Sequence, residues 1–179
     1  MANLLVVTGP PGAGKSTVAR LLADNFDRSV LVEGDAFFAF LANGRIDPWL
    51  PDSHDQNTVV VEAAASAAGQ FASSGYATIY DGVLGPWFLA TFLAAAGTNE
   101  LDYVILLPSI ETCVNRVATR QGHGFADGPA TRKMHDEFTK AVISERHVLR
   151  DPTSSAREVA DAILLAQQRG ALACRPDQP

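Results

Sequence analysis

The sequence has few of the features that mark secreted, membrane-bound or metal-cluster proteins. Its 179 residues include only two cysteines, Cys113 and Cys174, which fit neither a metal-ligand spacing nor a disulfide framework. No apolar stretch is long and continuous enough to span a bilayer, and a predicted strand follows Met1 too closely to leave room for a signal peptide. We therefore expect a cytoplasmic protein with reduced thiols and no membrane partner.

Positive charge is also scarce. The chain carries 14 Lys and Arg against 20 Asp and Glu, a net charge of −6, and has no basic cluster. This balance argues against a nucleic-acid partner, although a local positive site can exist inside an acidic protein. No Lys or Arg occurs between Val30 and Gly44, or between Ile46 and Leu107. A phosphate group bound there would have no cation from either segment to pair with.

What is present is typical of one globular domain. The hydrophobic fraction is 47% and the charged fraction is 19%, and the length suffices for a core of ordinary size. No internal repeat or low-complexity linker divides the chain. We expect a single domain over residues 1–170 and a flexible tail over residues 171–179.

Apolar, strand-like runs alternate along the chain with helical patterns. The predicted strands are Leu4–Thr8, Ser29–Glu33, Ala77–Asp81, Asp102–Leu107 and a weaker one at His147–Leu149. The predicted helices are Lys15–Asn25, Ala36–Ala42, Asp55–Ser73, Pro86–Ala95, Ile110–Arg120, Thr131–Glu145 and a last helix that ends near Arg169 and is capped by Ser154 or Ser155. This alternation predicts an α/β fold whose parallel sheet is covered on both faces.

The most specific motif follows the first strand. Its residues fit the pattern G-x-x-x-x-G-K-[ST] and are Gly9, Pro10, Pro11, Gly12, Ala13, Gly14, Lys15 and Ser16. The strand before it and the helix after it are the neighbours that this phosphate-binding loop requires, because strand, glycine turn and helix N-terminus together form the anion site.

The residue types of this loop explain the chemistry. Glycines let main-chain N–H groups converge on phosphate oxygens, and the helix start that includes Thr17 adds roughly half a positive charge. Lys15 can reach the β- and γ-phosphates, and Ser16 supplies a hydroxyl for Mg²⁺. We expect ATP and Mg²⁺ to bind here.

Three carboxylates come at the ends of predicted strands, where ligands bind in such sheets. Asp35 is expected to accept the proton of an acceptor hydroxyl, or otherwise only to cap the following helix. Asp81 is expected to hold Mg²⁺ together with Ser16, or otherwise to form an Asp-Gly turn with Gly82. Glu33 is the other candidate metal residue, or it points to solvent.

A glycine-rich segment, Gln121–Pro129, lies between two predicted helices and is interpreted as part of a lid over residues 116–132. Arg116 and Arg120 lie four residues apart on one helix face. They are expected to neutralise charge on the transferred phosphoryl group, unless they are only exposed surface residues. Arg132 and Lys133 could also face the phosphates. Arg150 is expected to border the adenine ring.

Aromatic and polar residues between the second and third strands suggest an acceptor pocket. Phe38 and Trp49, with Asp81 and Gly82, are the candidate substrate-binding residues beside Asp35. The alternative is that the aromatic residues belong to the ordinary core and that the polar residues, which include His54, only begin a helix.

With these features in place, the chain resembles the P-loop small-molecule kinases. These include the gluconate, shikimate, adenylylsulfate and chloramphenicol kinases and are related to the nucleoside-monophosphate kinases. Gly9–Lys15 looks like an adenylate kinase loop, with Ser16 where those enzymes commonly carry Gly. Glu33-Gly34-Asp35 is similar to the Asp-x-Asp of shikimate, gluconate and adenylylsulfate kinases, and Arg116–His123 is similar to the gluconate kinase lid.

The resemblance implies a three-layer P-loop NTPase fold with a five-stranded parallel sheet, flanking helices and a small helical lid. It implies that Asp35 binds or activates the acceptor hydroxyl. Asp81–Gly85 begins like the Asp-Gly-Phe-Pro-Arg of adenylate kinases but lacks the arginine, and the helix after Asp35 has no arginine for an acceptor phosphate. A neutral or weakly charged alcohol is therefore favoured over a nucleotide.

The predicted function is transfer of the γ-phosphate of ATP to a hydroxyl of a small molecule such as a sugar acid, a cyclic alcohol or an antibiotic-like acceptor, by a monomer or homodimer. The alternatives are a nucleotide or polynucleotide 5′-kinase, and a P-loop ATPase switch without a small-molecule acceptor.

Overall fold

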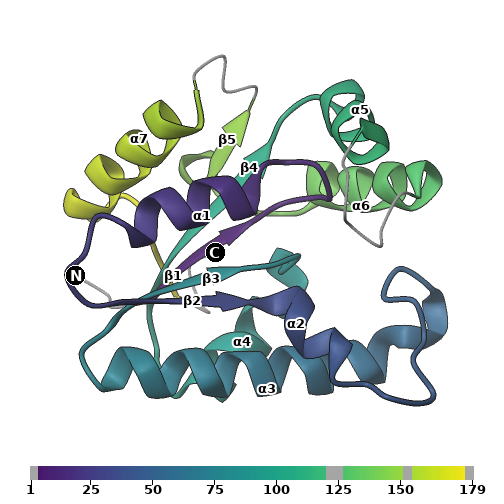
Figure 1. The fold of residues 1–179 in the computed structure, drawn as a ribbon, viewed down its shortest axis with the longest axis horizontal. Coiled ribbons are helices and arrows are strands. Elements are labelled where there is room, and N and C mark those ends of the chain that lie inside the picture. The colour runs from purple at the N-terminus through teal and green to yellow at the C-terminus, as the bar shows by residue number, and fades with distance from the viewer. Residues whose placement is uncertain (1–3, 120–126, 151–154, 176–179) are drawn as a thin grey trace.

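The computed structural model describes residues 4–119, 127–150 and 155–175. Its centre is a six-stranded sheet, in which five parallel strands follow the order β2-β3-β1-β4-β5 and β6 pairs antiparallel with β4 (Figure 1). The strands are β1 (Leu4–Thr8), β2 (Ser29–Glu33), β3 (Ala77–Asp81), β4 (Leu101–Leu107), β5 (Val148–Arg150) and β6 (Ala173–Cys174). The predicted α/β class and five-stranded parallel sheet are confirmed.

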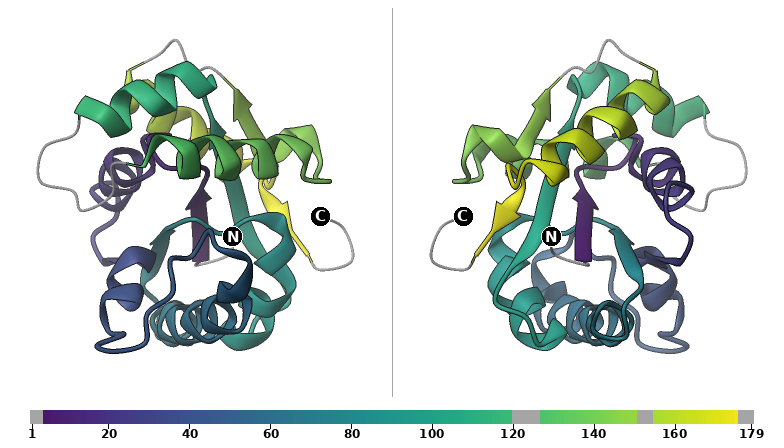
Figure 2. Two further views of the ribbon diagram at one scale, coloured as in Figure 1. Left: turned by 90° about the vertical axis from the view of Figure 1, so that its right-hand side faces the viewer. Right: turned by 90° about the vertical axis from the view of Figure 1, so that its left-hand side faces the viewer.

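Helices cover both faces of the sheet, so the fold has three layers (Figure 2). They are α1 (Lys15–Ala23), α2 (Gly34–Ala39), α3 (His54–Ser73), α4 (Leu89–Ala96), α5 (Ile110–Thr119), α6 (Gly128–Lys140) and α7 (Ala156–Gln168). The short 3₁₀ segments are η1 (Pro51–Ser53), η2 (Pro86–Phe88) and η3 (Glu145–His147). Within the described residues, no helix combines the length and hydrophobicity that crossing a membrane requires.

The alternating side chains of the strands divide the core in two. On one face Leu5 and Val7 of β1 pack with residues of α1 and α7. On the other face Leu4 and Val6 pack with residues of α3 and α4. Successive residues of a strand point to opposite faces, so both sides of a central strand are covered, and all residues of β1 and β4 are buried.

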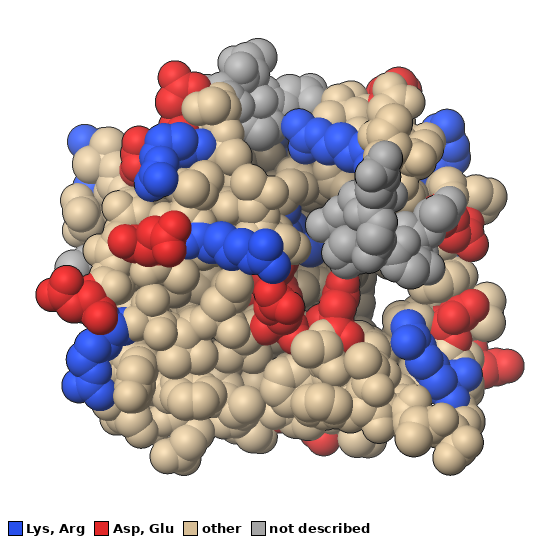
Figure 3. Space-filling view, in the orientation of Figure 1, with Lys and Arg blue, Asp and Glu red and all other residues tan. Residues whose placement is uncertain are grey.

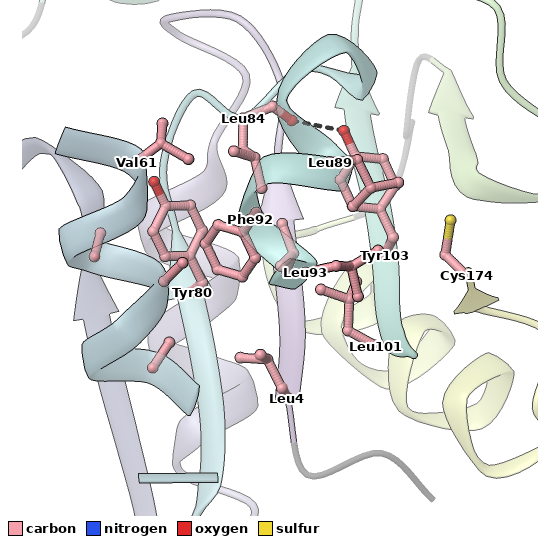
Figure 4. Close-up of a cluster of buried hydrophobic side chains, with 14 of the residues drawn as sticks. Leu4, Val61, Tyr80, Leu84, Leu89, Phe92, Leu93, Leu101, Tyr103 and Cys174 are labelled. Carbon is pink, nitrogen blue, oxygen red and sulfur yellow. Dashed lines mark hydrogen bonds between the residues drawn. The ribbon is translucent and has the colours of Figure 1, made fainter. Parts of the chain in front are cut away.

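Two central strands, β1 and β4, fix the loop after β3 through hydrogen bonds. Thr8 accepts a hydrogen bond from the Leu84 amide at 2.8 Å, and the Tyr103 hydroxyl donates to the Leu84 carbonyl at 2.6 Å. Both donor–acceptor pairs are buried, and Figure 4 shows the Tyr103 hydroxyl reaching Leu84. Buried main-chain groups need such partners, so residues 82–85 have one fixed path along the edge where the strands end.

Several expected boundaries differ in the structure. The predicted flexible tail begins too early, because β6 pairs with the start of β4 and the side chains of Leu172 and Cys174 are buried. Helix α6 begins at Gly128 rather than Thr131, since Asp127 caps it by accepting from the Ala130 amide at 2.9 Å.

The last helix starts as expected. Ser155 caps α7 and forms a reciprocal capping box with Glu158.

Candidate functional site

The loop between β1 and α1 is an open cradle of main chain. Gly9, Gly12 and Gly14 have φ angles of 141°, 79° and 96°, which L side chains rarely adopt. A Cβ at Gly9 would lie 2.2 Å from the Leu106 carbonyl oxygen, and one at Gly12 would lie 2.3 Å from that of Cys113. Gly9 and Gly12 are therefore required by conformation and by space, and Gly14 by conformation alone.

Two basic side chains contact this loop. Lys15, at the first turn of α1, donates from Nζ to the Pro10 carbonyl at 3.0 Å. Arg116, on α5, places one guanidinium nitrogen 3.3 Å from the Gly12 carbonyl oxygen and 3.4 Å from that of Ala13. The sequence-predicted residues Lys15 and Arg116 thus meet over the same turn from different elements.

A cavity of about 400 Å³ opens beside the loop. Residues 12–18 line one side of the cavity, and Arg116 and Thr119 of α5 line a second side. The rest of its lining is apolar and consists of Leu106, Ala156 and Val159. The polar part suits a chain of phosphates, and the apolar part suits a flat ring such as a nucleobase.

Asp81 ends β3 beside this cradle and is 6% exposed. Burial raises its pKa above the usual value, while a hydrogen bond with Ser16 and the charge of Lys15 lower it. The charges of Asp35 and Glu33 raise the pKa further. The parallel register explains the meeting, since Val7, Asp81 and Glu33 lie opposite one another at the ends of β1, β3 and β2.

The other two carboxylates differ in their surroundings. Glu33 forms an ion pair with Arg20 of α1 at 3.2 Å, with both side chains largely exposed. Asp35 is exposed in the first turn of α2. Figure 3 shows acidic side chains gathered at the centre of this face of the molecule. The alternative role of Asp35 as the helix cap is wrong, because α2 begins at Gly34 and Glu33 takes the cap position.

The Tyr80 side chain lies against Gly34, the residue before Asp35, and against Gly82, the residue after Asp81. A Cβ at Gly34 would be 2.4 Å from its hydroxyl oxygen, and one at Gly82 would be 2.7 Å from it. Burial, then the charges of Asp35 and Asp81, raise the pKa of Tyr80, so the hydroxyl stays protonated. The main chain next to Asp35 and the main chain next to Asp81 therefore both contact one side chain of the sheet.

The predicted acceptor residues lie along this edge, but other aromatics accompany them. Phe38 and Trp49 are half-buried in and after α2. His54 stacks on Phe88 with ring centroids 5.7 Å apart, and Trp87 is 47% exposed. Sequence reasoning gave no role to Phe88 or Trp87, because Pro86–Phe88 matched the start of a helix pattern.

Two further basic residues are engaged elsewhere. Lys133 bonds the Trp49 carbonyl rather than facing the loop. Arg150 pairs with Glu145 at 2.9 Å and is not among the described residues that line the cavity. Arg120 lies outside the described residues, as does the glycine-rich segment up to residue 126.

Magnesium needs few protein ligands when phosphates supply the others. Among the residues whose placement is described, no three His, Cys, Asp or Glu side chains form a metal cluster. The Ser16 hydroxyl and the Asp81 carboxylate, linked by a hydrogen bond beside the phosphate cradle, are a donor set of the kind that Mg²⁺ shares with a nucleotide.

A family model described as an AAA domain matches residues 4–144. The chain belongs to this AAA domain family. A search of curated proteins found no match.

Solved structures share the fold of this AAA domain protein. A sugar kinase from Janibacter sp. HTCC2649 has 20% identity and a TM-score of 0.70, with 92% of this chain and 94% of that chain covered. A gluconokinase from Sinorhizobium meliloti 1021 has 20% identity and a TM-score of 0.64, covering 95% and 94%. The tunicamycin resistance protein of Deinococcus radiodurans has 16% identity and a TM-score of 0.67, covering 95% and 96%. The fold is that of P-loop small-molecule kinases, as the resemblance predicted.

Proposed function

We propose that this protein is an ATP- and Mg²⁺-dependent kinase that phosphorylates a hydroxyl of a small molecule. One observation carries the proposal. Lys15, Ser16 and Asp81 lie together at one edge of the sheet, beside the phosphate cradle. Asp35, in the first turn of α2, lies at the same edge. The fold shared with a sugar kinase and a gluconokinase supports phosphotransfer to a hydroxyl.

The nucleotide occupies the cavity beside the loop. Main-chain amides of residues 9–17 and the Lys15 ammonium hold its phosphates. Arg116 already lies over this turn, where its guanidinium can pair with the phosphoryl group that is transferred. The apolar part of the cavity receives the base.

Ser16 and Asp81 hold Mg²⁺, with Glu33 oriented toward Arg20 instead. When bound, the ion neutralises negative charge that the phosphates and carboxylates bring to this edge. The low exposure of Asp81 explains why a cation favours its ionised form, since water solvates the carboxylate poorly.

Asp35 acts on the acceptor. Its exposed carboxylate lies in the first turn of α2, close enough to Asp81 and Tyr80 for its charge to raise both of their pKa values. The acceptor oxygen attacks the γ-phosphorus as its proton passes to Asp35, and the bond to the leaving ADP breaks.

The test is an Asp35→Asn variant assayed for transfer and for nucleotide binding separately. We expect transfer to fall about 100-fold or more, with ATP affinity changed less than twofold. Asp52→Asn, an exposed carboxamide substitution in η1, is the matched control. Full transfer by the Asp35→Asn protein would remove the proton-acceptor role.

A further inference from the structure

The acceptor side of the site is poor in cations and rich in partly exposed apolar rings, and this inference rests on the proposed kinase function. From Val30 to Leu107 the sequence has a single Lys or Arg, Arg45. These residues include α2, α3, η2 and the loop after β3, which form the acceptor side of the edge. These elements therefore bring one cation, Arg45, and α6 brings Lys133, whose Nζ already bonds the Trp49 carbonyl. An anionic acceptor would need such a cation.

Partly buried apolar side chains lie on the elements that follow β2 and β3. Tyr80 lies beneath both Gly34 and Gly82, which joins the loops after β2 and β3. Phe37, Val83 and Phe88 are partly buried and pack at the border of the same core cluster. His54, exposed at the start of α3, stacks on Phe88 at a ring angle of 18°.

Three carboxylates lie at this edge. Asp81 and Glu33 are register partners at the ends of β3 and β2, and Asp35 lies in the first turn of α2 that follows β2. The space-filling view shows the molecule hollowed between acidic side chains near its centre and an opposite rim that carries basic side chains (Figure 3). A carboxylate or phosphate on the acceptor would lose solvation here and meet the exposed carboxylate of Asp35.

We propose that the acceptor carries no phosphate or carboxylate, and that a flat apolar part of it lies against the His54–Phe88 pair while its hydroxyl meets Asp35. The stacked rings lie at the start of α3 and in η2, and Phe37 and Val83 are partly buried against the same core cluster as Phe88. Such a surface selects an uncharged alcohol with a ring by contact area and excludes its acidic counterparts by charge.

The first experiment separates this inference from the proposed function. A small-molecule extract is divided on an anion-exchange column, and each fraction is incubated with the enzyme, Mg²⁺ and γ-labelled ATP. We expect labelled product from the unretained, neutral fraction. Label only in the retained fraction overturns the inference and leaves the kinase function standing. Label from neither fraction contradicts both.

Variants then test the place of the ring contact. Phe88→Leu and His54→Ala should each raise the KM for the neutral pool roughly three- to tenfold, with the KM for ATP unchanged. Phe71→Leu is the matched control, because Phe71 makes an edge contact with Tyr76 at the other end of α3. An equal effect of Phe71→Leu, or none of the first two, overturns the contact.

Charge substitutions give a second, opposite readout. His54→Arg adds a cation at an exposed position and should raise transfer to the retained, anionic pool relative to the neutral pool. Arg45→Met should leave the preference unchanged, since the acceptor needs no cation. A large loss of transfer in Arg45→Met would show that an anionic acceptor uses this arginine, and it would overturn the proposal.

Discussion

Lys133 of α6 donates a hydrogen bond from Nζ to the main-chain carbonyl of Trp49 at 2.5 Å. The bond joins the helix that follows the glycine-rich segment to the connection between α2 and α3. That connection is also fastened to α3, because the Gln56 side chain bonds both main-chain groups of Ile46 at 2.7 Å and Asn57 bonds the Pro48 carbonyl at 2.8 Å. The wall of the acceptor site is thus set by two helices.

Removing the Lys133 bond should loosen this wall without changing the nucleotide site. In Lys133→Met we expect the acceptor KM to rise severalfold and the ATP KM to stay the same, as measured by steady-state kinetics. Lys140→Met, which breaks an exposed ion pair with Asp136 on the same helix, should change neither. A rise in the ATP KM instead would indicate that Lys133 faces the phosphates.

Gly12 should tolerate no side chain. Gly12→Ala faces both a left-handed φ of 79° and the carbonyl of Cys113, whereas Gly75, with a φ of 82°, has open space around it. We expect Gly75→Ala to cost about 1–2 kcal/mol of unfolding free energy and Gly12→Ala to cost more and to weaken ATP binding. Denaturant titration and nucleotide binding measure the two effects, and equal losses in the two variants would contradict the steric argument.

Asp81 should lower the stability of the folded protein when it is ionised. Burial raises its pKa in the folded state, so the folded protein holds this proton to higher pH than the unfolded chain does. The stability that the protonated form contributes is present below the unfolded pKa and lost as pH rises through the folded one. Asp81→Asn should therefore melt higher than the parent at pH 8, with a smaller difference near pH 4.

The same variant should lose its response to magnesium. Thermal melting with Mg²⁺ and ATP should stabilise the parent protein more than Asp81→Asn, because the variant lacks the charged ligand. An unchanged magnesium effect would move the metal role to another residue.

Thr8 should matter for both stability and acceptor binding. Thr8→Val keeps the shape of the side chain but removes the acceptor for the buried Leu84 amide, which should cost about 1–3 kcal/mol in chemical denaturation. Because residues 82–85 then lose a fixed path, the acceptor KM should also rise. Thr139→Val, at an exposed position on α6, is expected to do neither.

The sequence predicted the strands closely because their signal is local. Leu4–Thr8 and Ala77–Asp81 are continuous apolar runs bounded by turn residues, and β1 and β3 occupy those bounds. The phosphate loop was equally accessible, since its glycines carry a fixed spacing. Strand β6 was missed because two residues give no periodicity, and only pairing with β4 defines them.

The acceptor side shows where sequence reasoning stops. The charges of Asp35 and Asp81 were placed at strand ends from topology alone. The stacking of His54 on Phe88 joins residues 34 positions apart, and no motif spacing signals it. Lys133 and Trp49 are 84 positions apart, so their bond exists only through tertiary packing.

The two hydrogen bonds to Leu84 separate scaffold from recognition. Thr8 and Tyr103 anchor the main chain after β3 from inside the sheet, while Val83 and Phe88, partly buried at the border of the core cluster, form the rim of the proposed acceptor site. Substitution at the rim can therefore change which substrate is preferred. The two hydrogen bonds to Leu84, and with them the alignment of the reacting groups, stay unchanged. Variants that laboratory evolution selects at the rim alone should therefore still fold.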